Sequence, residues 1–140
     1  MNRKTLMIAL GMGLAIGGAA LAWHDEKEHG SVKPLAARDI VEKVDGKPTK
    51  ATAVEVTLEA GQSGASHRHP GPVFGYVLEG EYEWAINDQP AKVLKVGETF
   101  YEPAGSLHRV SKNPGKATTR VLAWVIHPSD AESIVIPEKK

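Results

Sequence analysis

Three histidines are the residues of this chain best suited to chemistry. His67 and His69 are separated by a single residue, and His108 follows much later in the chain. Side chains alternate along an extended segment, so His67 and His69 point the same way and one metal ion can bind both imidazoles. A third ligand from a distant strand leaves coordination positions open for water or a substrate. The spacing predicts a divalent metal site, and the alternative is three polar histidines hydrogen-bonded to neighbours or water.

Glu102 is the carboxylate that we expect nearest to this site. It precedes Pro103, which favours an extended conformation for the residue before it, on a strand that leads to His108. An inward-pointing Glu102 is a candidate catalytic residue, as a fourth ligand, as a group that orients a histidine or as a general base. An outward-pointing Glu102 is an ordinary surface acid. Glu79 and Glu81 are expected to be solvated.

Residues 1–22 have the parts of a secretory signal peptide. Arg3 and Lys4 begin an otherwise uncharged run that ends in Ala20-Leu21-Ala22. The run is short and glycine-rich for a membrane span. We expect cleavage after Ala22 and a periplasmic or secreted protein, with an uncleaved N-terminal anchor as the alternative. The chain has no cysteine, which suits an oxidising compartment.

Length and charge limit the possible partners. Cleavage of the 140-residue chain leaves 118 residues, enough for one domain, with 15 basic against 17 acidic residues. The chain has no basic stripe, so we do not expect it to bind nucleic acid. Stable insertion in a membrane after cleavage is not expected either. The expected partner is a small-molecule ligand or substrate. Residues 23–36 are predicted to form a polar leader, with His24 and His29 as weak candidate metal ligands. Residues 37–140 are predicted to form the domain.

Within the predicted domain, short apolar runs alternate with turn residues. This pattern is typical of an antiparallel sandwich or barrel, and no segment has a helical period. The expected strands are 39–44, 51–58, 73–78, 81–86, 91–96, 98–102, 108–111, 118–127 and an edge strand at 132–136. Most of a group of five aromatic residues in this region are expected in the core: Phe74, Tyr76, Trp84, Phe100 and Tyr101. Arg68, Arg109 and His127 are expected at the surface.

The histidines and several glycines have a spacing that resembles the two motifs of the cupin family. The first motif is glycine, five residues, His-x-His, three or four residues, glutamate, six residues and glycine. Its fixed positions correspond to Gly61, His67, His69 and Gly80, with Val73 where the glutamate should be. The second motif is glycine, five residues, Pro-x-Gly, two residues, histidine, three residues and asparagine. Its positions correspond to Gly97, Pro103, Gly105 and His108, with Asn113 one residue late.

The resemblance implies an all-β protein with an antiparallel jelly-roll β-barrel of the RmlC-like cupin type. His67, His69 and His108 would line its cavity and bind a divalent metal. Iron is the first expectation, and zinc, manganese, nickel and copper are the others. Because the glutamate is missing, the usual ligand set and any standard substrate are in doubt. Three-histidine cupins occur among dioxygenases that bind substrate directly to iron, so metal binding is still expected.

These features together predict an exported, metal-binding single-domain cupin. As an enzyme it would be a metal-dependent, dioxygenase-like oxidoreductase that acts on a small organic molecule. The alternative is a non-catalytic periplasmic module that binds or senses a small molecule or a metal. A metal-free, isomerase-like cupin with a histidine as base is a third reading. Because cupins often pair through edge strands, a homodimer is also expected.

Overall fold

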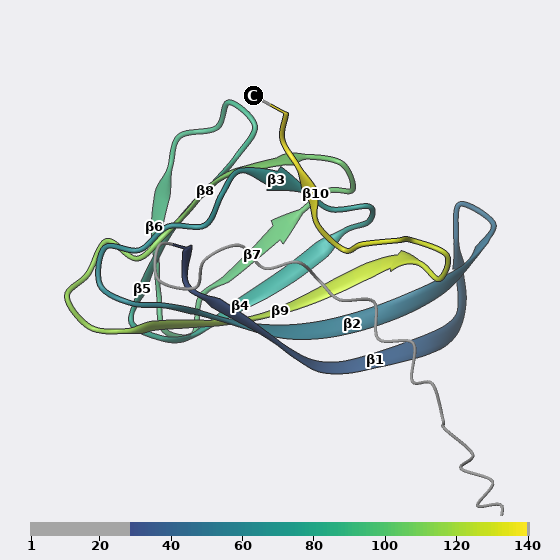
Figure 1. Cartoon of the computed structure of the whole chain (residues 1–140), viewed down its shortest axis with the longest axis horizontal. Helices are drawn as coiled ribbons and strands as arrows, with labels where there is room; N and C mark the ends of the chain where they lie inside the picture. Colours follow the sequence, from purple (N-terminus) through teal and green to yellow (C-terminus); the bar gives the residue numbers. More distant parts are fainter. Residues whose placement is uncertain (1–28, 140) are drawn as a thin grey trace, which may run out of the picture.

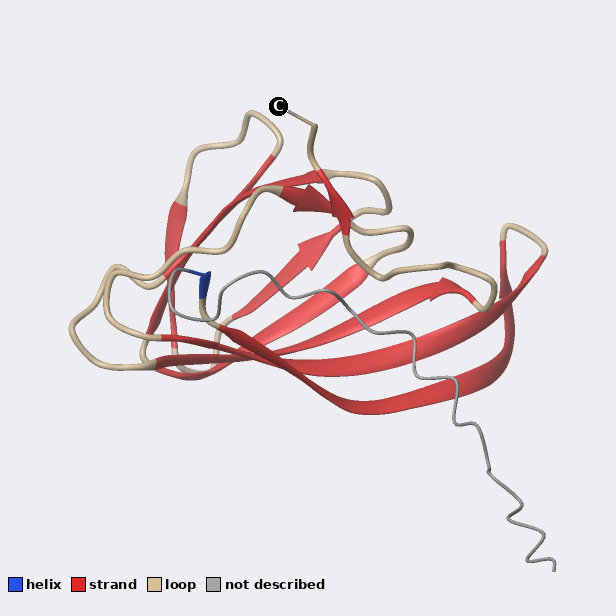
Figure 2. Cartoon of the chain, viewed as in Figure 1, coloured by secondary structure: helices blue, strands red, loops and turns tan. Residues whose placement is uncertain are grey.

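The protein folds as two antiparallel β-sheets, and the structure, a computed structural model, describes residues 29–139. The strands are β1 (Ser31–Val44), β2 (Lys47–Leu58), β3 (His67–Arg68), β4 (Val73–Glu79), β5 (Glu81–Ile86), β6 (Lys92–Lys95), β7 (Thr99–Glu102), β8 (Leu107–Lys112), β9 (Thr119–Pro128) and β10 (Ile136–Pro137). This confirms the predicted all-β jelly roll (Figures 1 and 2). No helix formed by residues 29–139 has the length and apolar character needed to cross a membrane.

The larger sheet has the order β1-β2-β9-β4-β7, and the smaller one has the order β10-β3-β8-β5-β6. The hydrophobic core lies between them, with Val54, Val77 and Val121 from the first sheet and Tyr82 and Ile86 from the second. In Figure 1 the long strands β1 and β2 extend to the right, beyond the smaller sheet.

Strand β9 shows how the sequence sets this arrangement. Its residues alternate, so that Thr119, Val121, Ala123, Val125 and His127 are buried while the residues between them are partly or fully exposed. A period of two places alternate side chains on one face. The strand pairs with β2 on one side and with β4 on the other. The prediction that residues 118–127 form a central strand is confirmed.

The same alternation corrects the prediction for the aromatic residues. Trp84 and Phe100 are buried, whereas Phe74, Tyr76 and Tyr101 are exposed. On β4 the inward positions belong to smaller residues, among them Gly75. The Phe100 ring occupies the space beside Gly75, where an added Cβ would lie 2.0 Å from it. Since one large ring already fills this part of the core, the aromatic residues on either side of Gly75 lie on the outer face.

Two boundaries differ from those expected. Strand β1 begins at Ser31, inside the segment 23–36 that the sequence predicts as a polar leader, because residues 31–44 pair antiparallel with β2. The final strand is Ile136–Pro137 and pairs with β3, later than the edge strand predicted at 132–136. Residues 1–22, predicted as a signal peptide, lie outside the described residues. The division into signal, leader and domain stays a prediction.

Gly80 and Gly105 meet the expectation for tight turns. Gly80 has φ +73° between β4 and β5, and an added Cβ there would lie 2.6 Å from the Thr118 carbonyl oxygen. Gly105 also has φ +73°, just before β8. Side chains with a Cβ rarely adopt this conformation, so glycine suits both positions. The second turn directs the chain into the strand that carries His108.

Asn113 fixes the connection after β8. Its side chain is fully buried, and its Nδ2 donates to the carbonyl oxygens of Leu58 (3.0 Å) and Ala117 (2.7 Å). Its Oδ1 accepts from the Gly115 amide at 2.8 Å. Three backbone groups from two parts of the chain therefore depend on one amide. This accounts for an asparagine here, one residue later than the motif expects.

We predict that Asn113→Ala destabilises the protein by about 1–3 kcal/mol, because it leaves buried backbone groups without partners. Urea denaturation followed by circular dichroism measures this as a lower midpoint with an unchanged slope. Lys116→Ala, an exposed change in the same turn, is the control and should have no effect. Equal midpoints for the two variants would contradict the role assigned to Asn113.

Candidate metal centre

Strand pairing brings the three predicted histidines together. β3 pairs antiparallel with β8, and in this register His67 lies directly opposite His108. His69 follows β3 by one residue. One ring nitrogen from each histidine can be chosen so that all three lie within 4.8 Å of one another. The predicted cluster is therefore present in space.

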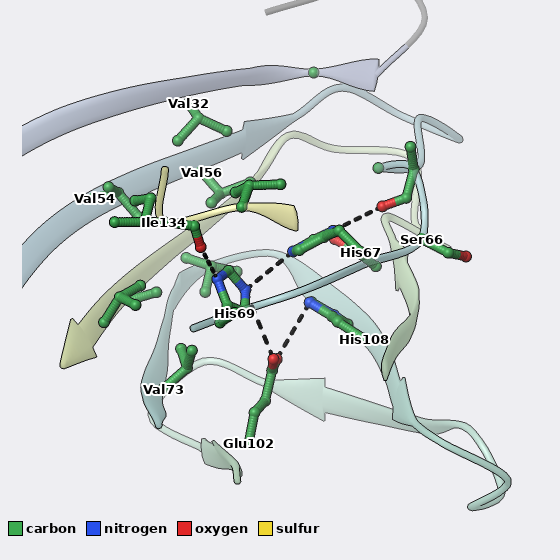
Figure 3. A pocket seen from close by; sticks show the side chains of 18 of the residues that line it. Val32, Val54, Val56, Ser66, His67, His69, Val73, Glu102, His108 and Ile134 are labelled. Atoms are coloured by element: carbon green, nitrogen blue, oxygen red, sulfur yellow. Dashed lines mark hydrogen bonds and ion pairs between the residues drawn. The ribbon is translucent and has the colours of Figure 1, made fainter. Parts of the chain in front are cut away.

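Two of the imidazoles have their orientation fixed by backbone carbonyls. His67 Nδ1 lies 2.8 Å from the Ala65 carbonyl oxygen, and His69 Nδ1 lies 2.6 Å from that of Ile134. A carbonyl only accepts hydrogen bonds, so each Nδ1 carries the proton and each Nε2 presents a lone pair. The two Nε2 atoms face each other at 3.0 Å (Figure 3).

His108 is held from behind by a hydroxyl group. Its Nε2 lies 3.3 Å from the Tyr82 hydroxyl oxygen, which lies 2.8 Å from Ser111 Oγ. With the proton on Nε2, His108 donates to Tyr82, and the Tyr82 hydroxyl donates to Ser111. The His108 Nδ1 lone pair then faces the other two histidines and Glu102. With this tautomer of His108, each histidine has one nitrogen engaged outside the cluster and one available inside it.

Burial keeps these imidazoles neutral. Loss of solvation, with a smaller contribution from the neighbouring histidines, lowers the pKa of His69 to about 4 and that of His108 to about 3. The pKa of His67 is lowered for the same first reason. A metal binds the neutral form, because the coordinating nitrogen must be unprotonated. At neutral pH the cluster is therefore ready to bind a cation without first losing protons from its histidines.

Glu102 points inward, which is one of the two orientations that the sequence left open. It is 1% exposed, and its Oε1 accepts a hydrogen bond from Trp84 Nε1 at 3.0 Å. Oε1 also lies 3.2 Å from His108 Nδ1, and Oε2 lies 3.8 Å from His69 Nε2. Burial raises the pKa of this carboxyl to about 7, against the opposing effect of the Trp84 hydrogen bond.

The donor atoms suit a divalent cation. Two atoms each about 2.1 Å from one ion lie about 3.0 Å apart at a right angle and about 3.4 Å apart at the tetrahedral angle. Three contacts among His67, His69, His108 and Glu102 measure 3.0, 3.2 and 3.8 Å, and the ligand atoms of the three histidines all lie within 4.8 Å of one another. Glu102 Oε2 is buried and has no hydrogen-bond partner among the described residues. An unpaired oxygen beside facing nitrogen lone pairs is the environment that a cation stabilises.

A cavity of about 310 Å³ opens from this cluster into the barrel. Most of its wall is aliphatic, and it includes Val54, Val56, Leu58, Val121, Val125 and Ile134. The polar side chains gather at one end, around the histidines and Glu102 (Figure 3). Sites that take small organic molecules combine such apolar walls with a few convergent polar groups.

The remaining candidates from the sequence lie away from this centre. Arg68 pairs with Glu138 at 3.0 Å, and Arg109 donates to backbone carbonyls on the exposed side, so both face outward as predicted. Glu79 and Glu81 are exposed, also as predicted. Val73 is buried and lines the cavity at the position of the missing motif glutamate.

Two other histidines also have defined places. The prediction that His127 lies at the surface is wrong, since it is 4% exposed. It lies on the inward-facing register of β9 and contacts Thr52 Oγ1 at 2.9 Å, outside the cluster. His29 lines the cavity, and its Nδ1 contacts the Ser63 carbonyl oxygen at 3.0 Å. His24 lies outside the described residues.

Sequence reasoning missed the groups that orient the ligands. Tyr82 and the Ile134 carbonyl lie 26 and 65 residues from the histidines they contact. Tyr82 alternates with Trp84 on a predicted strand, which was a signal that its side chain faces inward. The carbonyl of Ile134 carries no sequence signal, because every residue has one.

We predict that Tyr82→Phe lowers the affinity for Zn²⁺ by about 10- to 100-fold, the usual effect of removing a group that orients a ligand. The ring stays in the core, while His108 loses its partner. Titration calorimetry measures the affinity, and Tyr76→Phe on the outer face is the control. If both variants bind Zn²⁺ as tightly as the wild type, the Tyr82 hydroxyl does not hold His108.

Comparison with known proteins places this site in a family. The model of the Cupin domain family matches residues 54–125, just over half of the chain. No curated protein matches the chain. Among solved structures, an RmlC-like cupin protein from Desulfovibrio desulfuricans has 20% identity and a TM-score of 0.55, with 91% of this chain and 97% of that chain covered.

Two enzymes also share the fold. The DMSP lyase DddQ from Ruegeria pomeroyi has 22% identity and a TM-score of 0.54, over 75% of this chain and 53% of that one. An oxalate oxidase has 22% identity and a TM-score of 0.53, over 61% of this chain. The chain spans only 45% of the length of that oxidase. These likenesses establish the fold, and the family model with the two-sheet structure shows that the chain belongs to the cupin family.

Proposed function

We propose that this cupin binds one divalent metal ion through His67, His69 and His108 and acts on a small organic molecule held in the adjoining cavity. The observation that carries the proposal is the convergence of neutral imidazole lone pairs at the polar end of an apolar cavity. A bound iron, our first expectation, would supply Lewis acidity and redox chemistry toward the molecule. The reaction class that we propose is a dioxygenase-like oxidation.

The chain's own residues support this proposal by what they bind and exclude. An aliphatic wall disfavours water in the space beside the histidines, which would strengthen electrostatic interactions there. Neither lysine nor arginine lines the described cavity, and Glu102 is its one carboxylate. A small dianion such as oxalate would find no cationic side chain in this cavity. The lining therefore favours a molecule with an apolar body and a single polar end.

The proposed export of the chain rests on residues 1–22 and is independent of this chemistry. The alternative function is a non-catalytic module that uses the same ion and cavity to bind or sense a ligand. Turnover separates the two. Oxygen consumption by Fe²⁺-loaded protein in the presence of apolar phenols and enols supports the enzyme, and stoichiometric binding without consumption supports the module.

Elemental analysis of protein purified without added chelator tests the metal centre. We predict close to one divalent ion per wild-type chain and far less in His67→Ala and His108→Ala, because each change removes a ligand. His127→Ala is the matched control, a buried histidine outside the cluster, and it should retain the ion. Circular dichroism checks that all variants fold. Equally little metal in the wild type and in the variants would refute the centre.

The cavity is tested with n-alkyl hydroxamic acids, which carry a metal-binding group on an apolar chain. We predict that the dissociation constant for the Zn²⁺-loaded protein falls about fourfold per added methylene until the cavity is full. Ala123→Leu, which narrows the cavity, should weaken the longer acids and spare acetohydroxamic acid. Trp124→Phe, on the outer face of the same strand, is the control. An affinity independent of chain length would mean that the apolar wall does not contact the ligand.

A further inference from the structure

The position of the missing motif glutamate has a neighbour that carries a carboxylate. Val73 on β4 pairs directly with Glu102 on β7. Residues opposite each other on antiparallel strands lie on the same face, with Cβ atoms about 4.5–5.5 Å apart. Both residues are buried, and both line the cavity. The carboxylate that the motif places on β4 is therefore absent there, and a carboxylate is present instead at the facing position of the neighbouring strand β7.

The two oxygens of Glu102 have different surroundings. Oε1 is held by the Trp84 indole N–H at 3.0 Å and also lies 3.2 Å from His108 Nδ1. Oε2 has no hydrogen-bond partner among the described residues and lies 3.8 Å from His69 Nε2. A glutamate with a structural role alone would be expected to have both buried oxygens paired, since a buried polar atom without a partner is costly. Oε1 is thus anchored by Trp84, whereas Oε2 lies beside the histidine cluster without a hydrogen-bond partner among the described residues.

We propose that Glu102 is the fourth protein ligand of the metal, bound through Oε2, so that the carboxylate of this cupin comes from β7 instead of β4. The inference rests on the proposed metal centre and adds one residue to it. Trp84 is a positioning residue, because its indole holds Oε1 and turns Oε2 toward the histidines. With Glu102 bound, the ion and its protein ligands carry a net charge of +1, where three imidazoles alone would leave +2.

A carboxylate ligand also affects which metals bind. Oxygen ligands suit Mn²⁺, whereas imidazole nitrogen already suits Ni²⁺. Removal of the Glu102 carboxylate should therefore weaken Mn²⁺ more than Ni²⁺. A residue that only supported the fold would weaken both ions equally. The selectivity between the two metals thus reports direct coordination.

The experiment exchanges the residues of the facing pair. Metal-free wild type, Glu102→Gln, Glu102→Val and the double variant Val73→Glu/Glu102→Val are each titrated with Mn²⁺ and with Ni²⁺. Glu81→Gln, an exposed glutamate on β5, is the matched control, and His67→Ala tests the centre itself. Thermal unfolding of each metal-free protein checks that loss of affinity is not loss of structure.

We expect Glu102→Gln and Glu102→Val to weaken Mn²⁺ at least tenfold, since groups that merely orient ligands already contribute 10- to 100-fold. Ni²⁺ should be weakened less. The double variant should recover at least tenfold in Mn²⁺ affinity over Glu102→Val, because the carboxylate returns to the same face from the other strand. Glu81→Gln should bind both ions as the wild type does.

The inference is overturned if Glu102→Gln binds Mn²⁺ with the same affinity as the wild type. It is also overturned if the Glu102 variants lose affinity for Mn²⁺ and Ni²⁺ equally and the double variant does not recover Mn²⁺ affinity. If His67→Ala weakens binding while Glu102→Gln does not, the metal centre stands and only the fourth ligand is lost. If the wild type binds neither ion, the proposed function itself fails.

Discussion

The site depends on hydrogen-bond acceptors that face one another inside a mainly apolar interior. The Nε2 atoms of His67 and His69 lie 3.0 Å apart, while their protons are directed outward to backbone carbonyls. Protonation does not relieve this arrangement at neutral pH, because burial lowers the pKa of all three clustered histidines. Lone pairs so close together repel each other unless a positive charge lies between them. The fold therefore holds an arrangement that a cation completes.

The two sheets contribute different parts of this site. The smaller sheet supplies the histidines through the pairing of β3 with β8 and orients His108 through Tyr82 on β5. The larger sheet supplies Glu102 and most of the aliphatic wall. Because the histidines come from one side and the apolar wall largely from the other, a molecule in the cavity meets both. This asymmetry gives the cavity a polar end and an apolar wall.

The sequence was sufficient to predict the family, the all-β fold and the three clustered histidines. Those features are local, since a period of two places His67 and His69 together and the motif spacing adds His108. The orientation of Glu102 was within reach as well, because Phe100 and Glu102 share one face of β7 and Phe100 is a natural core residue. The same alternation would have moved Phe74 and Tyr76 to the outside.

Other features depend on contacts that no local pattern encodes. The register of β4 against β7, which places Glu102 opposite Val73, results from tertiary packing. The carbonyl acceptor for His69 comes from a segment 65 residues later in the chain. The strand at 31–36 was missed because its residues are largely exposed and gain their order from pairing with β2. The predicted export, domain division and homodimer stay predictions.

The contact between His69 and Ile134 has a thermodynamic consequence. Ile134 belongs to the segment after β9, which is tied to β3 by the pairing of β10 and by the ion pair of Arg68 with Glu138. A state in which this segment was detached would leave His69 without its acceptor and would bind the proposed ion more weakly. Any ligand that prefers one state stabilises that state in proportion to the logarithm of its concentration. With the proposed metal bound, a higher free metal concentration would therefore favour the state in which residues 129–139 are attached, and substitutions there would alter metal affinity without touching the ion.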